Sequence, residues 1–253
     1  MSTTFVILDK FKDALLRITP YVEKYKNEKN IELEFRLGFI EVEATLPLRS
    51  TSGVEATLSG VKATHAAKPS TPYFNTDIPV EFFNKITNKL NSNKNWAAVK
   101  KSKNTDYFNS GYRISVIDNK PVACIKKTKL VTINFRFEDT PFDIRFCISK
   151  EEPCVLNDVE KRIKNSNHSR EKQRTRFTHK YWNFDVTKVK EIENTVENIT
   201  HEIELDVSWP TEAPIDYVIY SSLLKMNDLA NMCENVSEES KMVFVSAKSD
   251  EKK

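Results

Sequence analysis

Residues 31–38, IELEFRLG, alternate apolar and charged side chains without a break. A β-strand points successive side chains to opposite faces, so Glu32, Glu34 and Arg36 share one face. The apolar side chains of the other face are Ile31, Leu33, Phe35 and Leu37. A single strand of this kind is typical of a sheet with one solvated face. The rest of the chain decides whether the charged face meets water or other charged faces.

The same pattern recurs far along the chain, in residues 201–207, HEIELDV. Here Glu202, Glu204 and Asp206 share one face of a second strand. Alternate side chains of a strand lie about 7 Å apart, so like charges in this arrangement repel unless a cation neutralises them. Two such strands predict a site for a hard cation, because oxygen ligands suit Mg²⁺ or Mn²⁺ better than zinc.

Basic side chains follow the same spacing in the strands expected between these two. Residues 169–177, SREKQRTRF, place four bases on one face, namely Arg170, Lys172, Arg174 and Arg176. Further bases in this pattern are Arg113 in YRISV, Arg145 in FDIRFCIS and either Lys126 or Lys127 in CIKKTKL. Acids therefore concentrate on the first and last strands and bases on the strands between them. This segregation indicates that the charged faces look at one another.

A closed sheet brings these faces together. An antiparallel barrel of about eight strands encloses its inner face, so the charges would line the lumen. We therefore predict an α+β protein, mainly β, built on a closed eight-stranded antiparallel barrel with a charged lumen. Packing helices would cover the apolar outer face.

Segments outside the predicted strands are of several kinds. Apolar residues at helical spacing predict a helix over residues 7–26, which Pro20 ends or kinks. A second helix is predicted over residues 79–91. Residues 41–75 form a long irregular loop in this interpretation, and residues 96–210 are mostly strands. The whole is one domain over residues 1–234, followed by a charged and loosely ordered tail at 235–253.

Composition narrows the function. Four glycines in 253 residues cannot supply a glycine-rich phosphate loop, so any phosphate must be held by side chains. Four cysteines without a C-x-x-C pair favour a reducing compartment. No stretch reaches the roughly 20 apolar residues of a membrane-spanning helix. We therefore expect a soluble intracellular protein with no membrane partner.

The ordered motifs resemble a known family. Glu-x-Glu in a first strand, REKQR in a middle strand and Glu-x-Glu-x-Asp in a last strand are similar to the metal-dependent RNA 5′-triphosphatases of fungi, protozoa and large DNA viruses, which are triphosphate tunnel metalloenzymes. The resemblance spans residues 31–207. It implies removal of the γ-phosphate from 5′-triphosphate RNA by metal-assisted attack of water, which gives 5′-diphosphate RNA in the first step of mRNA capping.

This resemblance also implies a cofactor, partners and a location. The cofactor would be Mg²⁺ or Mn²⁺, and the substrate 5′-triphosphate RNA. An RNA guanylyltransferase would be a partner, on a separate chain or in a further domain. The location would be the nucleus or, for a viral protein, a cytoplasmic viral factory or the virion.

Site residues follow from the resemblance position by position. The expected metal ligands are Glu32, Glu34, Glu202 and Glu204. The expected triphosphate-binding side chains are Arg113, Lys126 or Lys127, Arg145, Arg170, Lys172, Arg174 and, in an alternative register, Arg176. Asp206 helps to hold metal or water, and Asp106 and Asp185 position the bases or the attacking water. The expected catalytic residues are Glu32, Glu34, Glu202, Glu204, Asp206, Arg113, Arg145, Lys172 and Asp185. One departure is Arg36, where the family often has lysine.

Two other functions fit the same residues. The first is hydrolysis of small triphosphates, such as nucleoside triphosphates or inorganic tripolyphosphate, because the motifs report the triphosphate and not what is attached to it. The second is a non-catalytic RNA-binding module that uses the basic run at 161–190 for phosphate contacts. In that case the acids of the first and last strands would have no role.

Overall fold

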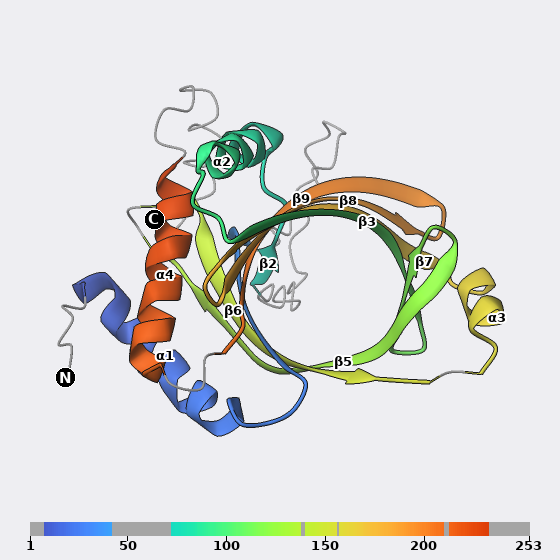
Figure 1. The fold of residues 1–253 in the computed structure, drawn as a ribbon, viewed down its shortest axis with the longest axis horizontal. Coiled ribbons are helices and arrows are strands. Elements are labelled where there is room, and N and C mark those ends of the chain that lie inside the picture. The colour runs from blue at the N-terminus through green and yellow to red at the C-terminus, as the bar shows by residue number, and fades with distance from the viewer. Residues whose placement is uncertain (1–7, 42–71, 138–139, 156, 210–212, 233–253) are drawn as a thin grey trace, which may run out of the picture.

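Eight antiparallel strands close into a barrel in this computed structural model, which describes residues 8–41, 72–137, 140–155, 157–209 and 213–232. Around the ring the order of the strands is β1 (Ile31–Glu41), β6 (Asp143–Pro153), β5 (Lys120–Phe135), β4 (Tyr112–Ile117), β3 (Ala98–Asn109), β7 (His168–His179), β8 (Trp182–Glu193) and β9 (Val196–Val207). Pairing of β9 with β1 completes the ring that Figure 1 shows. The predicted mainly-β barrel is confirmed.

Tight turns fix the register of neighbouring strands. Asp118 and Asn119 join β4 to β5, and Asn194 and Thr195 join β8 to β9. All four residues have positive φ, as two-residue hairpin turns of type I′ require. After glycine, Asn and Asp tolerate this conformation best, and they supply three of the four positions. Because side chains alternate along a strand, these turns also fix which charges enter the lumen.

Closure makes the first and last strands neighbours. In the β1–β9 ladder Glu34 pairs with Asp206, and Arg36 pairs with Glu204. On its other side β1 pairs with β6, where Arg36 lies opposite Arg145. The two acidic strands, about 170 residues apart in sequence, therefore form one continuous wall.

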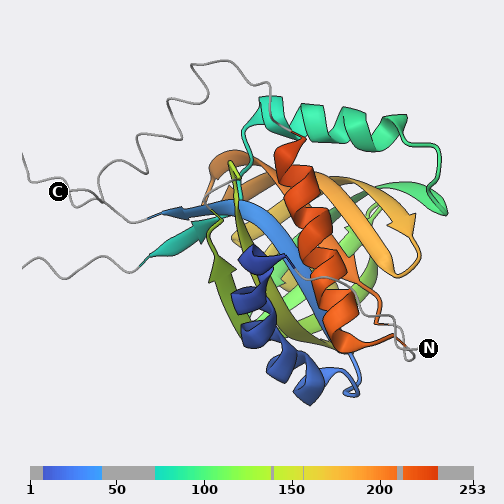
Figure 2. The ribbon, with the colours of Figure 1, turned by 90° about the vertical axis from the view of Figure 1, so that its left-hand side faces the viewer.

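Two long helices cover the apolar outside of this wall. α1 (Asp9–Tyr25) and α4 (Ile215–Asn231) lie side by side against the barrel in Figures 1 and 2. Phe35 of β1 is buried beneath them, and its ring centroid lies 5.0 Å from that of Phe146 on β6. A third helix, α2 (Val80–Ser92), packs its buried Phe82, Ile86 and Leu90 against the barrel. The predicted covering of the outer face by helices is thus confirmed.

Some predicted boundaries were wrong. Pro20 neither ends nor visibly interrupts α1, which continues to Tyr25. Pro20 cannot donate the backbone hydrogen bond to Leu16, so α1 loses this one bond at an exposed turn, where Leu16 is 76% exposed. Part of the predicted loop at 41–75 is a strand, β2 (Tyr73–Asn75), which pairs with the end of β1. Residues 42–71 and the predicted tail at 235–253 lie outside the described residues.

Two helices were missed. α3 (Val159–Lys164) interrupts the region predicted as strands, and α4 follows the last strand. α4 has a broad apolar surface, with Val218, Leu223 and Met226 almost fully buried. None of the helices formed by the described residues is long and apolar enough to cross a membrane.

Candidate active site

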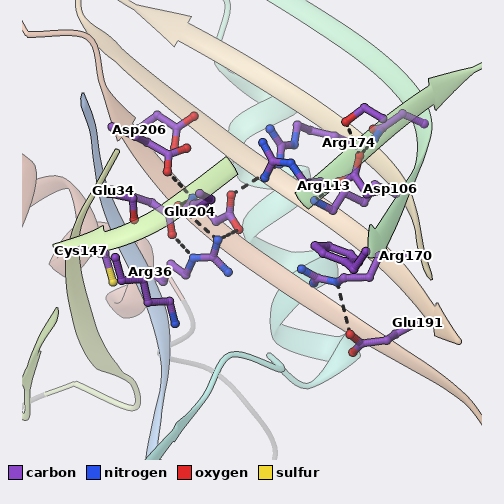
Figure 3. Close-up of a pocket in the computed structure, with 18 of the residues that line it drawn as sticks. Glu34, Arg36, Asp106, Arg113, Cys147, Arg170, Arg174, Glu191, Glu204 and Asp206 are labelled. Atoms are coloured by element: carbon purple, nitrogen blue, oxygen red, sulfur yellow. Dashed lines mark hydrogen bonds and ion pairs between the residues drawn. The ribbon is translucent and has the colours of Figure 1, made fainter. Parts of the chain in front are cut away.

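The barrel encloses a cavity of about 530 Å³ whose walls are charged and polar (Figure 3). Every strand of the ring contributes to its lining. The acids in the lining are Glu32, Glu34, Asp106, Glu191, Glu204 and Asp206. The bases are Arg36, Arg113, Lys127, Lys129, Arg145, Arg170, Lys172 and Arg174. An ordinary small barrel has an interior filled by apolar side chains, so this charged interior is the inverse arrangement.

A basic wall runs along β7. Arg170, Lys172 and Arg174 occupy alternate positions, so they all face the lumen. Lys172 is the most buried of them, and its Nζ lies 2.6 Å from Oδ2 of Asp106 on β3. Burial lowers the pKa of Lys172 despite this partner. Burial also acts to raise the pKa of Asp106, but the charge of Lys172 and its hydrogen bond outweigh it and lower that pKa. The two side chains therefore depend on each other.

An acidic wall faces it from β1 and β9. Arg36 lies among the carboxylates of this wall, with an ion pair to Glu34 and another to Glu204 at 2.9 Å (Figure 3). Burial by itself would raise the pKa of the Glu204 carboxyl, but the charges of Arg36 and Arg174 outweigh it and hold that pKa well below its usual range. The buried Glu204 carboxyl is therefore an anion at neutral pH.

Asp206 lies in the most crowded part of this wall. Its carboxylate belongs to two groups of oxygen atoms, and within each group all the atoms lie within 4.8 Å of one another. One group includes Glu32 and Glu34, and the other includes Asp185 and Glu204. Burial and the charges of Glu204 and Asp185 raise the pKa of Asp206 to about 7, although Arg176 pairs with it. Carboxylate oxygens alone, gathered this closely, suit a hard divalent cation, so the donor set fits the predicted metal.

The bases, in turn, leave room for an anion. Within the described residues, two buried side-chain nitrogens have no hydrogen-bond partner, namely Nε of Arg113 and Nε of Arg170. Both arginines line the cavity and hold acids through other nitrogens, Arg113 with Glu151 and Arg170 with Glu202. Nε of Arg170 also lies 3.7 Å from Glu191, beyond hydrogen-bond distance but within that of an ion pair. Unpaired buried donors are costly, and an anionic oxygen such as that of a phosphate would satisfy them.

Most residues predicted for the site come together in this cavity. Two of them lie just behind its lining. Asp185 is fully buried and holds Arg174 at 2.9 Å and Arg176 at 2.6 Å. Glu202 is almost fully buried, and it pairs with Arg170 rather than joining either group of ligand atoms. Glu202 thus contacts the basic wall in this structure.

The structure also decides the choices that the sequence left open. Lys127 lines the cavity and pairs with Glu32, whereas Lys126 is exposed on the other face of β5. The inclusion of Lys126 among the triphosphate-binding residues is corrected accordingly, since adjacent residues of a strand point to opposite faces. Arg176 shares the inward face of β7 but lines a neighbouring hollow of about 410 Å³, together with Asp206.

Several lining residues were missed. Arg36 was noted only as a departure, yet it is the cation at the centre of the acidic wall. Its position two residues after Glu34 was the available signal. Lys129 lies two residues after Lys127, so the same alternation could have predicted that it faces the cavity. Phe108 and His168 also line the cavity, but they become neighbours only through the pairing of β3 with β7.

Comparison with known proteins finds both a family and a fold. Residues 20–215 match the family described as mRNA capping enzyme, beta chain. The RNA triphosphatase Pct1 of S. pombe is 19% identical, with a TM-score of 0.67 over 90% of this chain and 94% of that chain. In complex with the Spt5 CTD, Pct1 gives a TM-score of 0.65 at the same identity and coverage.

A viral structure is also similar. The capping enzyme triphosphatase of mimivirus is 15% identical, with a TM-score of 0.52 over 87% of this chain and 98% of that chain. At these identities the solved structures show the shared fold alone. No curated protein sequence matches the chain.

Proposed function

This chain belongs to the mRNA capping enzyme, beta chain family, and we propose that its charged barrel cavity binds the 5′-triphosphate end of RNA and releases the γ-phosphate. As an RNA triphosphatase it is a hydrolase that produces 5′-diphosphate RNA in the first step of capping. The observation that carries the assignment to this cavity is the meeting of an acidic wall and a basic wall in one enclosed space. A non-catalytic RNA-binding module would have no use for the acids.

The basic wall is proposed to hold the phosphates. Arg170, Lys172 and Arg174 of β7 form this wall, and Arg113 of β4 adds a buried Nε that has no hydrogen-bond partner. Phosphoryl transfer spreads negative charge over the oxygens of the leaving and transferring groups. Donors fixed in advance by Asp106 and Asp185 stabilise that charge without reorganising during the reaction.

The acidic wall is proposed to hold the metal and the attacking water. The ligands proposed here are Glu32, Glu34 and Glu204, whose oxygens gather around Asp206, and Mg²⁺ or Mn²⁺ suits them. Glu202, which the resemblance also implies as a ligand, pairs with Arg170 in this structure. When bound, the ion supplies Lewis-acid stabilisation of the γ-phosphate. Asp206, whose carboxylate oxygens lie with those of Glu32 and Glu34 and with those of Asp185 and Glu204, is placed to orient the attacking water.

The test measures labelled γ-phosphate released from triphosphate-ended RNA, with Mg²⁺, with Mn²⁺ and with a chelator. Glu34→Ala and Glu204→Ala should each abolish metal-dependent release, because they remove one acid from β1 and one from β9. Glu197→Ala, an exposed glutamate of the same strand β9, is the matched control and should leave release unchanged. Release that survives both cavity substitutions would contradict the assignment of the reaction to this cavity.

Small triphosphates form a second candidate substrate class, because the charged groups of the cavity are suited to phosphates whatever is attached to them. Competition between triphosphate-ended RNA and inorganic tripolyphosphate separates the two classes. A partner is also proposed, an RNA guanylyltransferase on another chain or domain, since the diphosphate end is the group that capping modifies next. The protein would then work in the nucleus or, for a virus, in the viral factory or virion.

A further inference from the structure

We propose that the stacked rings of Phe108 and His168 form a platform for the first nucleoside of the RNA, next to the triphosphate. Phe108 lies on β3 and His168 directly opposite it on β7. Their ring centroids are 4.5 Å apart with an interplanar angle of 20°. The inference rests on the proposed binding of the triphosphate in the barrel cavity, and it names the part of the substrate that distinguishes RNA from a bare triphosphate.

The platform lies where two spaces join. Both rings line the charged cavity, and both also line an adjoining hollow of about 440 Å³. Both are half-buried, so part of each ring is accessible from these spaces. Bases stack on aromatic side chains in many RNA complexes because every base has a π-face.

Neighbouring contacts hold the backbone of both residues and the imidazole of His168 in place. The Ser166 hydroxyl lies 2.8 Å from the carbonyl oxygen of Phe108 and 2.7 Å from that of His168. The imidazole Nε2 of His168 lies 2.6 Å from Glu191. A surface that is fixed before binding loses little conformational freedom when a base stacks on it.

The two arginines whose Nε atoms lack a hydrogen bond, Arg113 and Arg170, lie beside this platform. Arg113 pairs with Phe108 across the β3–β4 ladder, and Arg170 follows His168 at the next inward position of β7, about 7 Å along the strand. Figure 3 shows Arg170 and Glu191 apart from the carboxylates around Arg36. A triphosphate with its γ-phosphate at those carboxylates would extend past Arg170, and its nucleoside would then reach Phe108 and His168.

The charge of the two hollows also favours an RNA chain that leaves the barrel past Phe108 over one that leaves past Trp209. The hollow beside Phe108 is lined by Arg113, Lys127 and Lys129, with Glu193 as its acid. The hollow beside Trp209 has the acids Glu28, Glu32, Glu151 and Asp206 against the bases Lys26 and Arg176. The next phosphates of an RNA chain would be attracted to the first hollow and repelled from the second.

The test compares KM for triphosphate-ended RNA with KM, or the inhibition constant, for inorganic tripolyphosphate, which has no base. Phe108→Leu should raise the RNA value at least about fivefold relative to the tripolyphosphate value, since a stacked base contributes that much or more. Phe108→Tyr should restore the ratio. If Phe108→Leu does not fold, His168→Gln removes a ring while keeping a hydrogen-bonding group for Glu191, and it should raise the same ratio.

The matched control is Trp209→Leu, which removes an aromatic ring from the opposite hollow and should leave the ratio unchanged. A ratio that changes in Trp209→Leu and not in Phe108→Leu would overturn the platform and reverse the direction of binding. A ratio unchanged in folded Phe108→Leu and in folded His168→Gln would also overturn the platform. Failure of the proposed function is distinct, because the wild-type protein would then release no phosphate from RNA.

Discussion

The two faces of the β1–β9 wall are both buried, but by different means. On the outer face Phe35 is 1% exposed and Leu205 fully buried beneath the helices, where removal of apolar surface from water stabilises the fold. On the inner face Glu34 and Glu204 are each only 4% exposed, and they depend on Arg36 for compensation. Buried charges contribute little net stability even when paired. The comparison teaches that the outer face maintains the barrel, and that the barrel holds the inner face in place for chemistry.

The largest expected effect comes from the outer face. Phe35→Ala removes a fully buried ring that packs on Phe146 and should lower the free energy of unfolding by about 4 kcal/mol. Chemical denaturation monitored by circular dichroism measures it. A loss below about 1 kcal/mol would contradict the claim that burial of the outer face stabilises the barrel.

The second-largest loss of stability should come from the Asp106–Lys172 ion pair of the inner face. Asp106→Asn leaves the buried charge of Lys172 without its counter-ion and should cost about 3 kcal/mol. Combining it with Lys172→Met removes both charges and should recover most of that loss. A double-mutant cycle by denaturation tests this, and additive losses would show that the two side chains are not coupled.

Substitution of Asp206, unlike the two above, should raise the free energy of unfolding. Its folded pKa of about 7 lies above the ordinary aspartate value of 3.8, so the folded state keeps a proton that the unfolded chain has already released. The free energy of unfolding of the wild type should therefore fall as pH rises from about 4 through 7. Asp206→Asn lacks this loss and should gain at least about 1 kcal/mol relative to wild type between pH 5 and pH 8.

This experiment is done by denaturation with a chelator present, so that metal does not stabilise either protein. The pH trend, and not the offset at one pH, is the decisive observation. A difference between the two proteins that stays constant from pH 5 to pH 8 would mean that Asp206 titrates like an exposed aspartate.

The smallest effect on stability should come from β5. Lys126→Ala should change the free energy of unfolding by about 0.5 kcal/mol or less, since Lys126 is exposed. Lys127→Ala should lower it by about 1 kcal/mol or less, since Lys127 is partly buried and pairs with Glu32, Glu34 and Glu151. Their activities should differ, however. Lys127→Ala should lower kcat/KM for triphosphate-ended RNA at least about tenfold, and Lys126→Ala less than about twofold. Equal losses would show that the side of the strand does not matter.

The sequence predicted the two faces well because period-two alternation is local. Glu32, Glu34, Glu202 and Glu204 could be assigned to inner faces from their own strands, and barrel closure followed from the segregation of charge between strands. What alternation cannot give is partner choice. Only the folded structure shows that Glu202 pairs mainly with Arg170, with Arg36 at 3.9 Å, whereas Glu204 lies 2.9 Å from Arg36 and 3.7 Å from Arg174.

Other features could not be predicted for reasons specific to each position. Helix α1 continues through Pro20 at a turn where Leu16 is 76% exposed, and exposure is a tertiary property. The choice between Lys126 and Lys127 needs the register of β5, which contains a shift between Lys129 and Val131. Phe108 and His168 are about 60 residues apart and become a stacked pair only through the β3–β7 ladder.

The most direct test of the difference between the faces uses two adjacent residues of β9, Glu204 and Leu205. We predict that Glu204→Gln loses at least about 99% of γ-phosphate release while its free energy of unfolding falls by less than about 1 kcal/mol, since Arg36 retains Glu34. Leu205→Ala should lose about 3 kcal/mol of stability and keep most of its activity where it is folded. The reverse result, with stability lost in Glu204→Gln and activity lost in folded Leu205→Ala, would contradict the division of labour between the two faces.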